Sequence, residues 1–102
     1  MEYTIPLKQN HIFRRLYAKR NGLSFNRLGI TTGVKLGRAV DRNRARRRIR
    51  ESYRLQEARL KAGYDIVIVA RTAAIDGDFT ELGKSFLHLC KKLKLLKEED
   101  RP

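Results

Sequence analysis

The sequence has few of the residues from which disulfides, metal sites and membrane spans are built. Its 102 residues include one cysteine, two histidines and no tryptophan. The lone Cys90 cannot form a disulfide within the chain, so we expect a reducing, cytoplasmic setting. No apolar run approaches the roughly 20 residues of a membrane-spanning helix, and residues 1–10 lack the apolar core of a signal peptide. These absences exclude a disulfide-stabilised scaffold and argue against a membrane protein.

No group of side chains predicts an active site or a metal site in the protein itself. His11 and His88 lie far apart in the sequence, and the lysines around His88 indicate a solvated surface residue. Cys90 falls on an apolar stripe, where a small core residue is expected. Residues 77–85 differ from a phosphate-binding loop, because five residues instead of four separate the two glycines and two of the five are acidic. We therefore predict neither a catalytic residue nor a metal ligand.

Acidic residues are also scarce, which leaves the chain strongly basic. There are 11 acidic and 24 basic residues, a formal net charge of +13 and a pI near 10.6. A charge of this size disfavours the compact state and favours binding to polyanions. A guanidinium group matches phosphate oxygens two at a time, and one short segment predicts nucleic-acid binding because it concentrates seven arginines: Arg38, Arg42, Arg44, Arg46, Arg47, Arg48 and Arg50.

These arginines are expected to lie on a folded helix, not on a flexible basic tail. Asp41 is the predicted N-cap of a helix that runs to about Leu60. At about 100° per residue, Ala45, Ile49, Tyr53 and Leu60 form one narrow apolar stripe. Only Asp41 and Glu51 balance the charge, whereas solvated helix faces usually mix signs. One flank of the stripe carries Asn43, Arg46, Arg47, Arg50 and Arg54, and the other carries Arg44 and Arg48.

Two elements are predicted before this helix. Phe13, Leu16 and Tyr17 recur at spacings of three and four, which predicts a first helix capped by Asn10. A short strand is expected at residues 28–32. Phe13 and Tyr17 would then lie one helical turn apart, and two roles are open for them: core packing, or an exposed platform on which single-stranded bases stack.

Two further elements are predicted after it. The continuous β-branched run of residues 64–71 predicts a strand that is buried on both faces. Residues 72–77 are expected to form a loop. Asp78 is the predicted cap of the last helix, whose apolar face comprises Leu82, Phe86, Leu89, Cys90, Leu93 and Leu96. With no repeat and no linker, residues 1–102 are expected to form a single domain of mixed α and β structure.

Residues 37–50, Gly-Arg-Ala-Val-Asp-Arg-Asn-Arg-Ala-Arg-Arg-Arg-Ile-Arg, closely resemble the signature of the bacterial ribonuclease P protein subunit. The Arg-Asn-Arg core of that signature is residues 42–44 here. The similarity covers nearly the whole chain in the right order. Residues 7–17 resemble the family's opening helix, residues 27–30 its strand before the signature, and residues 63–71 and 84–89 its last strand and last helix.

The chain departs from the family pattern in two places. Residues 22–27 resemble only the beginning of a family strand, so a strand-and-turn unit of about ten or more residues is missing near residues 21–28. A narrower sheet is expected as a result. At residues 32–35 the family commonly has Ser-Lys-Lys, so one basic contact is lost at Val34.

The resemblance implies an α/β fold, more closely an α+β two-layer sandwich. It has a small mixed sheet, three helices and a left-handed βαβ crossover, against the usual right-handed rule. The resemblance also implies a protein cofactor of a ribozyme, whose RNA removes the 5′ leader from precursor tRNA with Mg²⁺ held mainly by the RNA. The implied partners are ribonuclease P RNA and precursor tRNA, and no obligate protein partner is indicated.

The same resemblance implies two separate RNA-binding surfaces. Phe13 and Tyr17 are expected to hold the single-stranded leader beside the sheet. The catalytic RNA is expected to contact Lys35, Arg38, Arg42, Asn43, Arg44, Arg46, Arg47, Arg48 and Arg50. A ribosomal-protein-like structural RNA binder is the alternative, and it would share the arginine helix but need no aromatic cleft. A small DNA-binding domain fits less well, because no compact helix-turn-helix pattern is present.

Overall fold

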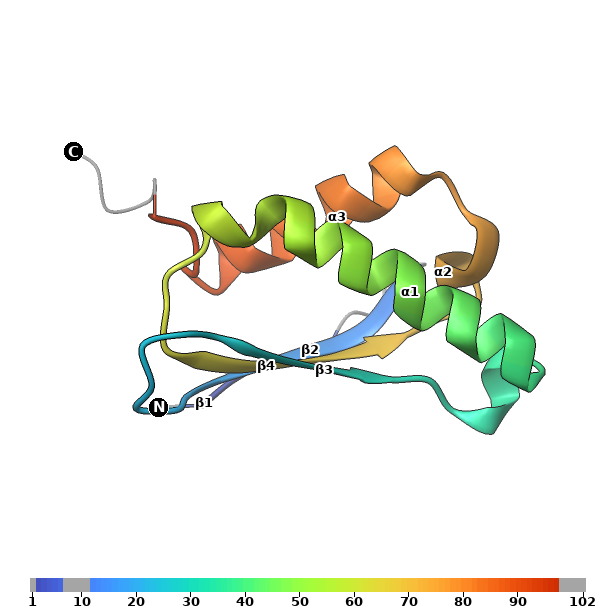
Figure 1. The fold of residues 1–102 in the computed structure, drawn as a ribbon, viewed down its shortest axis with the longest axis horizontal. Coiled ribbons are helices and arrows are strands. Elements are labelled where there is room, and N and C mark those ends of the chain that lie inside the picture. The colour runs from blue at the N-terminus through green and yellow to red at the C-terminus, as the bar shows by residue number, and fades with distance from the viewer. Residues whose placement is uncertain (1, 7–11, 98–102) are drawn as a thin grey trace.

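The computed structural model describes residues 2–6 and 12–97, which form one sheet with helices on one side of it (Figure 1). None of the helices in these described ranges has the length and apolarity needed to cross a bilayer. Short 3₁₀ turns at Val34–Leu36 and Glu57–Arg59 flank the central helix. The strands and helices are β1 Glu2–Pro6, β2 Phe13–Arg20, β3 Arg27–Thr31, α1 Ala39–Gln56, β4 Tyr64–Ala70, α2 Ala73–Asp76 and α3 Phe79–Lys92.

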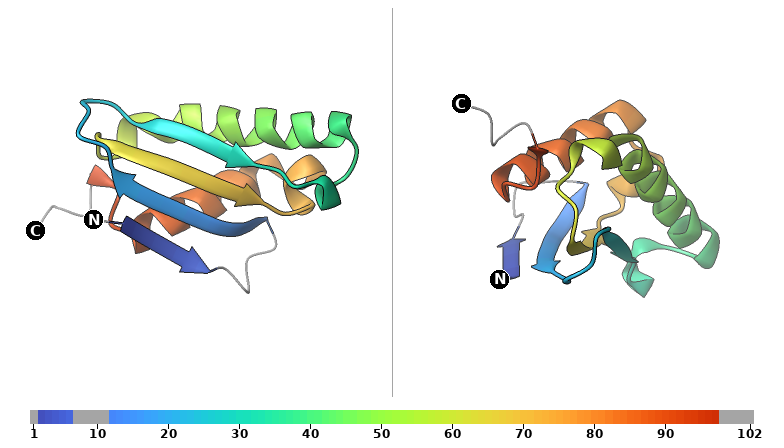
Figure 2. Two further views of the ribbon diagram at one scale, coloured as in Figure 1. Left: turned by 90° about the horizontal axis from the view of Figure 1, so that it is seen from below. Right: turned by 60° about the vertical axis from the view of Figure 1, so that its left-hand side comes forward.

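The strand order of the sheet is β1-β2-β4-β3. Strand β2 is antiparallel to both of its neighbours, whereas β3 and β4 are parallel and α1 connects them. In the left view of Figure 2 the helices lie behind the sheet. If that view is rotated in its own plane until the arrows of β3 and β4 point upward, β3 lies to the left of β4. The chain then leaves β3, passes behind the sheet through α1 and enters β4 on the right. The crossover is therefore left-handed, and the predicted fold class is confirmed.

Residues 13–20 form strand β2, so the predicted first helix is wrong over this range. The register with β4 shifts between Phe13 and Arg15, which marks a β-bulge. Because of the extra residue, the buried side chains Phe13, Leu16 and Ala18 are spaced by three and then by two. The spacing of three imitates one turn of a helix. The expected cap, Asn10, lies outside the described residues, as does His11.

Only residues 21–26 connect β2 to β3, and none of them is in a strand. This agrees with the predicted absence of a strand-and-turn unit here. Strand β3 consequently has β4 as its one strand neighbour within the described ranges. The sheet nevertheless has four strands, because β1, which the sequence did not predict, pairs with β2 at the opposite edge.

The core lies between the sheet and the helices. The predicted stripe of α1 is buried and consists of Ala45, Ile49 and Tyr53, with Leu60 also buried after the helix ends. The Tyr53 and Phe86 rings meet edge to face at 5.9 Å between centroids. The apolar face of α3 is buried as predicted, although the helix ends at Lys92 and two of its expected members follow that end: Leu93 and Leu96. Cys90 is buried and His88 is exposed, both as predicted.

Three local predictions need correction. Helix α1 begins at Ala39, so Asp41 is its third residue and not its N-cap, although its carboxylate accepts a hydrogen bond from the Arg38 backbone N–H at 3.1 Å. Strand β4 is fully buried on one face only, because alternate residues are half-exposed. The expected loop of residues 72–77 contains the short helix α2. The predicted cap Asp78 is confirmed, since its carboxylate accepts from the Thr80 N–H at 2.8 Å.

Candidate nucleic-acid interface

Helix α1 carries most of the predicted RNA-binding residues, and its sides differ in what the arginines contact. We call Asn43, Arg46, Arg47 and Arg50 the outer row. Arg47 and Arg50 are exposed and make no hydrogen bond or ion pair within the part of the chain that the structure describes. Arg46 reaches only the side-chain oxygen of Asn43, at 3.4 Å. The outer row therefore presents positive charge that no carboxylate neutralises.

The acidic residue closest to this row in sequence is already paired. The Glu51 carboxylate accepts two hydrogen bonds from Arg54, at 2.5 and 3.1 Å. This contact lowers the pKa of Glu51 and raises the pKa of Arg54. Glu51 is thus neutralised within its own turn of helix and leaves the field of the outer row intact.

Arg44 and Arg48, the inner pair, lie on the opposite flank of α1, against α2. The Nε atom of Arg44 donates to the carbonyl of Ile75 at 2.8 Å. The Nε atom of Arg48 donates to the carbonyl of Ala74 at 3.1 Å, and its Nη2 donates to the carbonyl of Gly77. The carbonyls at the C-terminal end of a helix are its negative end, which favours cations. The inner pair therefore ties α1 to α2.

Aromatic contact adds to this junction. The guanidinium carbon of Arg48 lies 5.8 Å from the centroid of the Phe79 ring, within cation–π range. Phe79 is the first residue of α3, so Arg48 contacts both ends of the α2–α3 connection. The donors that the inner pair commits to these contacts are occupied before any nucleic acid binds.

The N-terminal end of α1 adds basic residues to the outer row. Arg38 is almost fully exposed, at 86% of its side chain, and its Nε lies 3.8 Å from the Asp41 carboxylate. Arg42 donates to the carbonyl of Gly37 at 2.9 Å. Gly37 has a φ of 145°, and a Cβ there would lie 2.8 Å from the Asp41 carboxylate, so glycine is needed for this turn. The turn places exposed Lys35 just before the helix.

The sheet face opposite the helices is a second candidate surface. Strand alternation directs Tyr17 to this face, where it is half-buried. Tyr17 is paired with Val67, and Val67 in turn is paired with Gly29. These three residues form a row across the middle of the sheet. Because Gly29 has no side chain, the row is low and apolar beside Val67. Arg15 donates to the Tyr17 hydroxyl at 3.1 Å, so a cation borders the aromatic ring.

Phe13 does not share this surface. Its side chain is 0% exposed and belongs to the core between sheet and helices. The bulge after Phe13 reverses the alternation, so Phe13 and Tyr17 point to opposite faces of the sheet. The expectation that both rings line one leader-binding groove is therefore wrong for Phe13, and of the two alternatives core packing holds for it.

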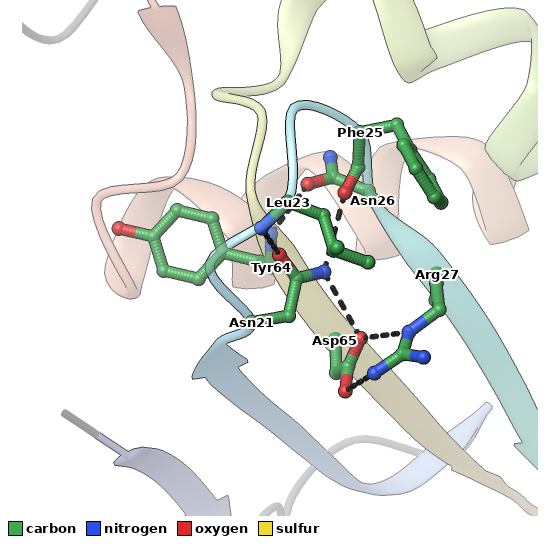
Figure 3. A network of polar contacts seen from close by, with 7 residues as sticks. All are labelled: Asn21, Leu23, Phe25, Asn26, Arg27, Tyr64 and Asp65. Carbon is green, nitrogen blue, oxygen red and sulfur yellow. Dashed lines mark hydrogen bonds and ion pairs between the residues drawn. The ribbon is translucent and has the colours of Figure 1, made fainter.

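One end of the open face carries a tight ion pair. Arg27 and Asp65 are neighbours in β3 and β4, and two hydrogen bonds of 2.7 Å join them. Asn21 donates to the same carboxylate at 3.0 Å (Figure 3). The hydrogen bonds from Arg27 and then Asn21 lower the pKa of Asp65 to about 2. Asp65 therefore stays ionised and holds the Arg27 guanidinium on this surface.

Sequence reasoning missed three basic residues of the open face: Arg15, Lys19 and Arg27. All three are exposed and come from β2 and β3. The signal was present, because Arg15, Tyr17 and Lys19 alternate at the strand period of two. The helical interpretation of residues 13–17 obscured that alternation.

Comparisons with known proteins agree on one family. The sequence profile described as ribonuclease P matches residues 7–94. The ribonuclease P protein component of Alkaliphilus oremlandii is 39% identical over 104 residues, which cover 88% of this chain and 91% of that protein. That of Caldanaerobacter subterraneus is 42% identical over 86 residues, covering 84% and 74%. The alignment with the Alkaliphilus protein has 104 positions, yet it covers only 88% of this 102-residue chain. Some positions of the alignment are therefore gaps in this chain, where the relative has residues without a counterpart here.

Solved structures give the same result. The RNase P protein from Thermotoga maritima superposes with a TM-score of 0.76 at 29% identity, covering 89% of this chain and 83% of that one. The RNase P protein of Staphylococcus aureus gives a TM-score of 0.75 at 30% identity, covering 94% and 84%. These matches favour the family resemblance over the ribosomal-protein-like and DNA-binding alternatives.

Proposed function

Because the chain belongs to the ribonuclease P protein family, we propose that it assists a catalytic RNA in removing the 5′ leader from precursor tRNA. The protein is then a non-catalytic subunit of a ribonucleoprotein endoribonuclease. Its contribution is positive charge and shape, since RNA-binding proteins gain affinity by neutralising phosphates and releasing counterions. The observation that carries this proposal is the un-neutralised outer row on a helix of the matched region.

The outer row, with Lys35, Arg38 and Arg42, is the proposed contact with the catalytic RNA. Arg47 and Arg50 are exposed and Arg46 is half-buried, and a helix holds all three in place, so phosphate binding costs little ordering of the backbone. Arg44 and Arg48 belong to the same signature, but we propose that their main role is to fix α2 against α1. Any phosphate contact they make uses the donors left over from that junction.

The open sheet face is the proposed contact with the single-stranded leader. Tyr17 offers a half-exposed ring for stacking, while Arg15, Lys19 and Arg27 supply charge for the backbone. The low apolar row formed with Val67 and Gly29 gives a base room to approach the ring. The outer row lies on α1, which covers one face of the sheet, whereas Tyr17 lies on the other face, so the two proposed surfaces do not overlap.

Mg²⁺ is proposed to be held mainly by the RNA. The residues that the structure describes include no group of three or more His, Cys, Asp or Glu side chains that could hold a metal ion. The donor set of the described chain therefore does not fit a metal site. The protein instead supplies cationic side chains, which reduce the amount of Mg²⁺ that the RNA needs for charge neutralisation.

Reconstitution tests the proposal directly. Purified protein is added to a bacterial ribonuclease P RNA, and leader removal from precursor tRNA is followed at low and high Mg²⁺. We expect the protein to restore cleavage at low Mg²⁺ and to cleave nothing by itself. Failure to stimulate the RNA at any Mg²⁺ concentration, or cleavage by rigorously RNA-free protein, would overturn the proposal.

A further inference from the structure

A cavity at one end of the sheet is not used by either proposed surface. It has a volume of about 450 Å³, is open to solvent, and lies where β2 ends and β4 begins. This end of the molecule is opposite to the Val34–Leu36 turn along the longest axis (Figure 1). Volumes of 300–1,000 Å³ are usual for sites that take small ligands. The cavity lining includes Arg20, Leu23, Lys61 and Tyr64.

Two asparagines hold the walls of this cavity in place (Figure 3). The Asn21 side-chain oxygen accepts from the Leu23 N–H at 2.8 Å, which fixes the loop after β2. The Asn26 side chain donates to the carbonyl of Lys61 at 2.9 Å and accepts from the Tyr64 N–H at 2.8 Å. Asn26 thereby fastens the loop after β2 to the segment of residues 61–64 that leads into β4. A preformed site of this kind loses little conformational entropy when a ligand binds.

The lining combines positive charge with apolar surface. The Arg20 guanidinium carbon lies 6.0 Å from the centroid of the Tyr64 ring, which orients this cation at the cavity. Lys61 supplies a second cation from the opposite wall, and the lining residues within the described ranges include no carboxylate. Leu23 is 39% exposed and provides an apolar surface beside the two cations. The carboxylate of the neighbouring Asp65 is bound by Arg27.

We propose that this cavity binds one unpaired nucleotide of RNA. Its phosphate is held between Arg20 and Lys61, and its base lies against Leu23. The mixture of two cations and an apolar wall fits a nucleotide, since an inorganic anion alone would leave the apolar surface of Leu23 exposed. The inference rests on the proposed function, and it adds a third RNA contact to the arginine helix and the open sheet face. The nucleotide comes from either the catalytic RNA or the leader.

A charge-removal experiment tests the phosphate contact and identifies which RNA, the catalytic RNA or the leader, supplies the phosphate. The double variant Arg20→Gln/Lys61→Gln is compared with wild type and with Lys84→Gln/Lys91→Gln, which removes the same charge from the exposed side of α3. One arm measures affinity for the catalytic RNA across a salt series. The other measures affinity of the assembled enzyme for precursors with long and short leaders.

Each lost phosphate contact lowers the salt-dependence slope by about 0.7–0.9. Because Arg20 and Lys61 hold one phosphate between them, we expect the slope of the cavity variant to fall by about 0.7–0.9 in one arm, and that of the control variant to fall less. Circular dichroism confirms that both variants are folded. Slopes that match those of the control variant in both arms would overturn the inference.

Cross-linking provides a second measurement that does not depend on affinity. The single native cysteine is buried, so Leu23→Cys can be labelled selectively with a photo-activated cross-linker in the assembled enzyme. We expect cross-links to an unpaired nucleotide of one RNA, with none from a matched Lys91→Cys variant. If wild type stimulates cleavage but labelled Leu23→Cys cross-links to neither RNA, the cavity inference fails while the proposed function stands. If wild type does not stimulate cleavage, the proposed function itself has failed.

Discussion

Arg47 and Arg48 are adjacent in sequence and have the same side chain, yet they have different surroundings. Arg47 is exposed and makes no hydrogen bond or ion pair with another described residue, whereas Arg48 donates to two backbone carbonyls and lies over an aromatic ring. A rotation of about 100° about the helix axis separates them. The comparison teaches that an arginine-rich helix is not one uniform binding site. The outer row leaves its positive charge without a carboxylate partner among the described residues, whereas the inner pair joins α1 to α2.

The strongest test of this comparison changes the third side of α1, the buried stripe. Ile49 is 1% exposed, so Ile49→Asp places an unpaired charge in the core and should cost about 4 kcal/mol or more. We expect loss of the folded state, measured by circular dichroism. A cooperative thermal transition close to that of wild type would show that the stripe is not essential to the fold.

Arg48→Ala should destabilise the protein while leaving most of its RNA binding intact. Hydrogen bonds from a charged donor contribute about 1.5–3 kcal/mol each when their partners are left buried. We expect a loss in that range in the free energy of unfolding, measured by urea denaturation. Arg47→Ala is the matched control and should change stability by less than about 0.5 kcal/mol. Equal stability of the two variants would remove the distinction between the inner pair and the outer row.

The converse experiment removes two members of the outer row. Arg46→Ala/Arg50→Ala should reduce affinity for the catalytic RNA on the order of tenfold, and each lost contact should lower the salt slope by about 0.7–0.9. Stability should stay close to wild type, because these guanidinium groups hold nothing in the core. An unchanged slope in a folded variant would exclude both residues from the interface.

A smaller effect is expected on the sheet face. Tyr17→Ala removes a half-buried ring, and base stacking contributes about 1–3 kcal/mol when complete. We expect roughly fivefold weaker binding of precursor tRNA, at the lower end of that range, with mature tRNA almost unaffected. Tyr17→Phe keeps the ring and loses only the hydroxyl that Arg15 contacts, so it should retain most of the preference. Equal losses for both RNAs would make Tyr17 a structural residue.

The smallest effect concerns the ion pair at the end of this face. The pKa of Asp65 is lowered to about 2 in the folded protein, against about 3.9 in an unfolded chain. The stabilisation is therefore complete above the unfolded pKa and is lost as the pH falls from about 4 towards about 2. Wild type should lose slightly more thermal stability over this interval than Asp65→Asn, measured by thermal melts. Parallel melting curves would show that the pair does not contribute to stability.

The arginine helix and the last helix could be predicted from the sequence because periodicity and burial coincide there. Ala45, Ile49 and Tyr53 recur at four and are all buried. Asp78 was recognised as a cap because its local chemistry suffices for that role. In these segments the pattern is local, so neighbouring residues carry all the information required.

Residues 13–20 could not be assigned correctly because the deciding feature is non-local. The bulge in β2 arises only in pairing with β4, some 50 residues away in sequence. Without that partner, the spacing of Phe13 and Leu16 fits a helix as well as a strand. The division between inner pair and outer row was likewise hidden, since the carbonyls that bind Arg44 and Arg48 belong to a short helix that was expected to be a loop.

The left-handed crossover also bears on the order of folding. Strands β3 and β4 are parallel neighbours, so they cannot pair until the chain between them has reversed direction through α1. Helix α1, which makes this connection, carries Arg42, Arg44, Arg46, Arg47, Arg48, Arg50 and Arg54, whose like charges repel one another. A polyanion that screens those charges would favour α1 and, through it, the pairing of β3 with β4.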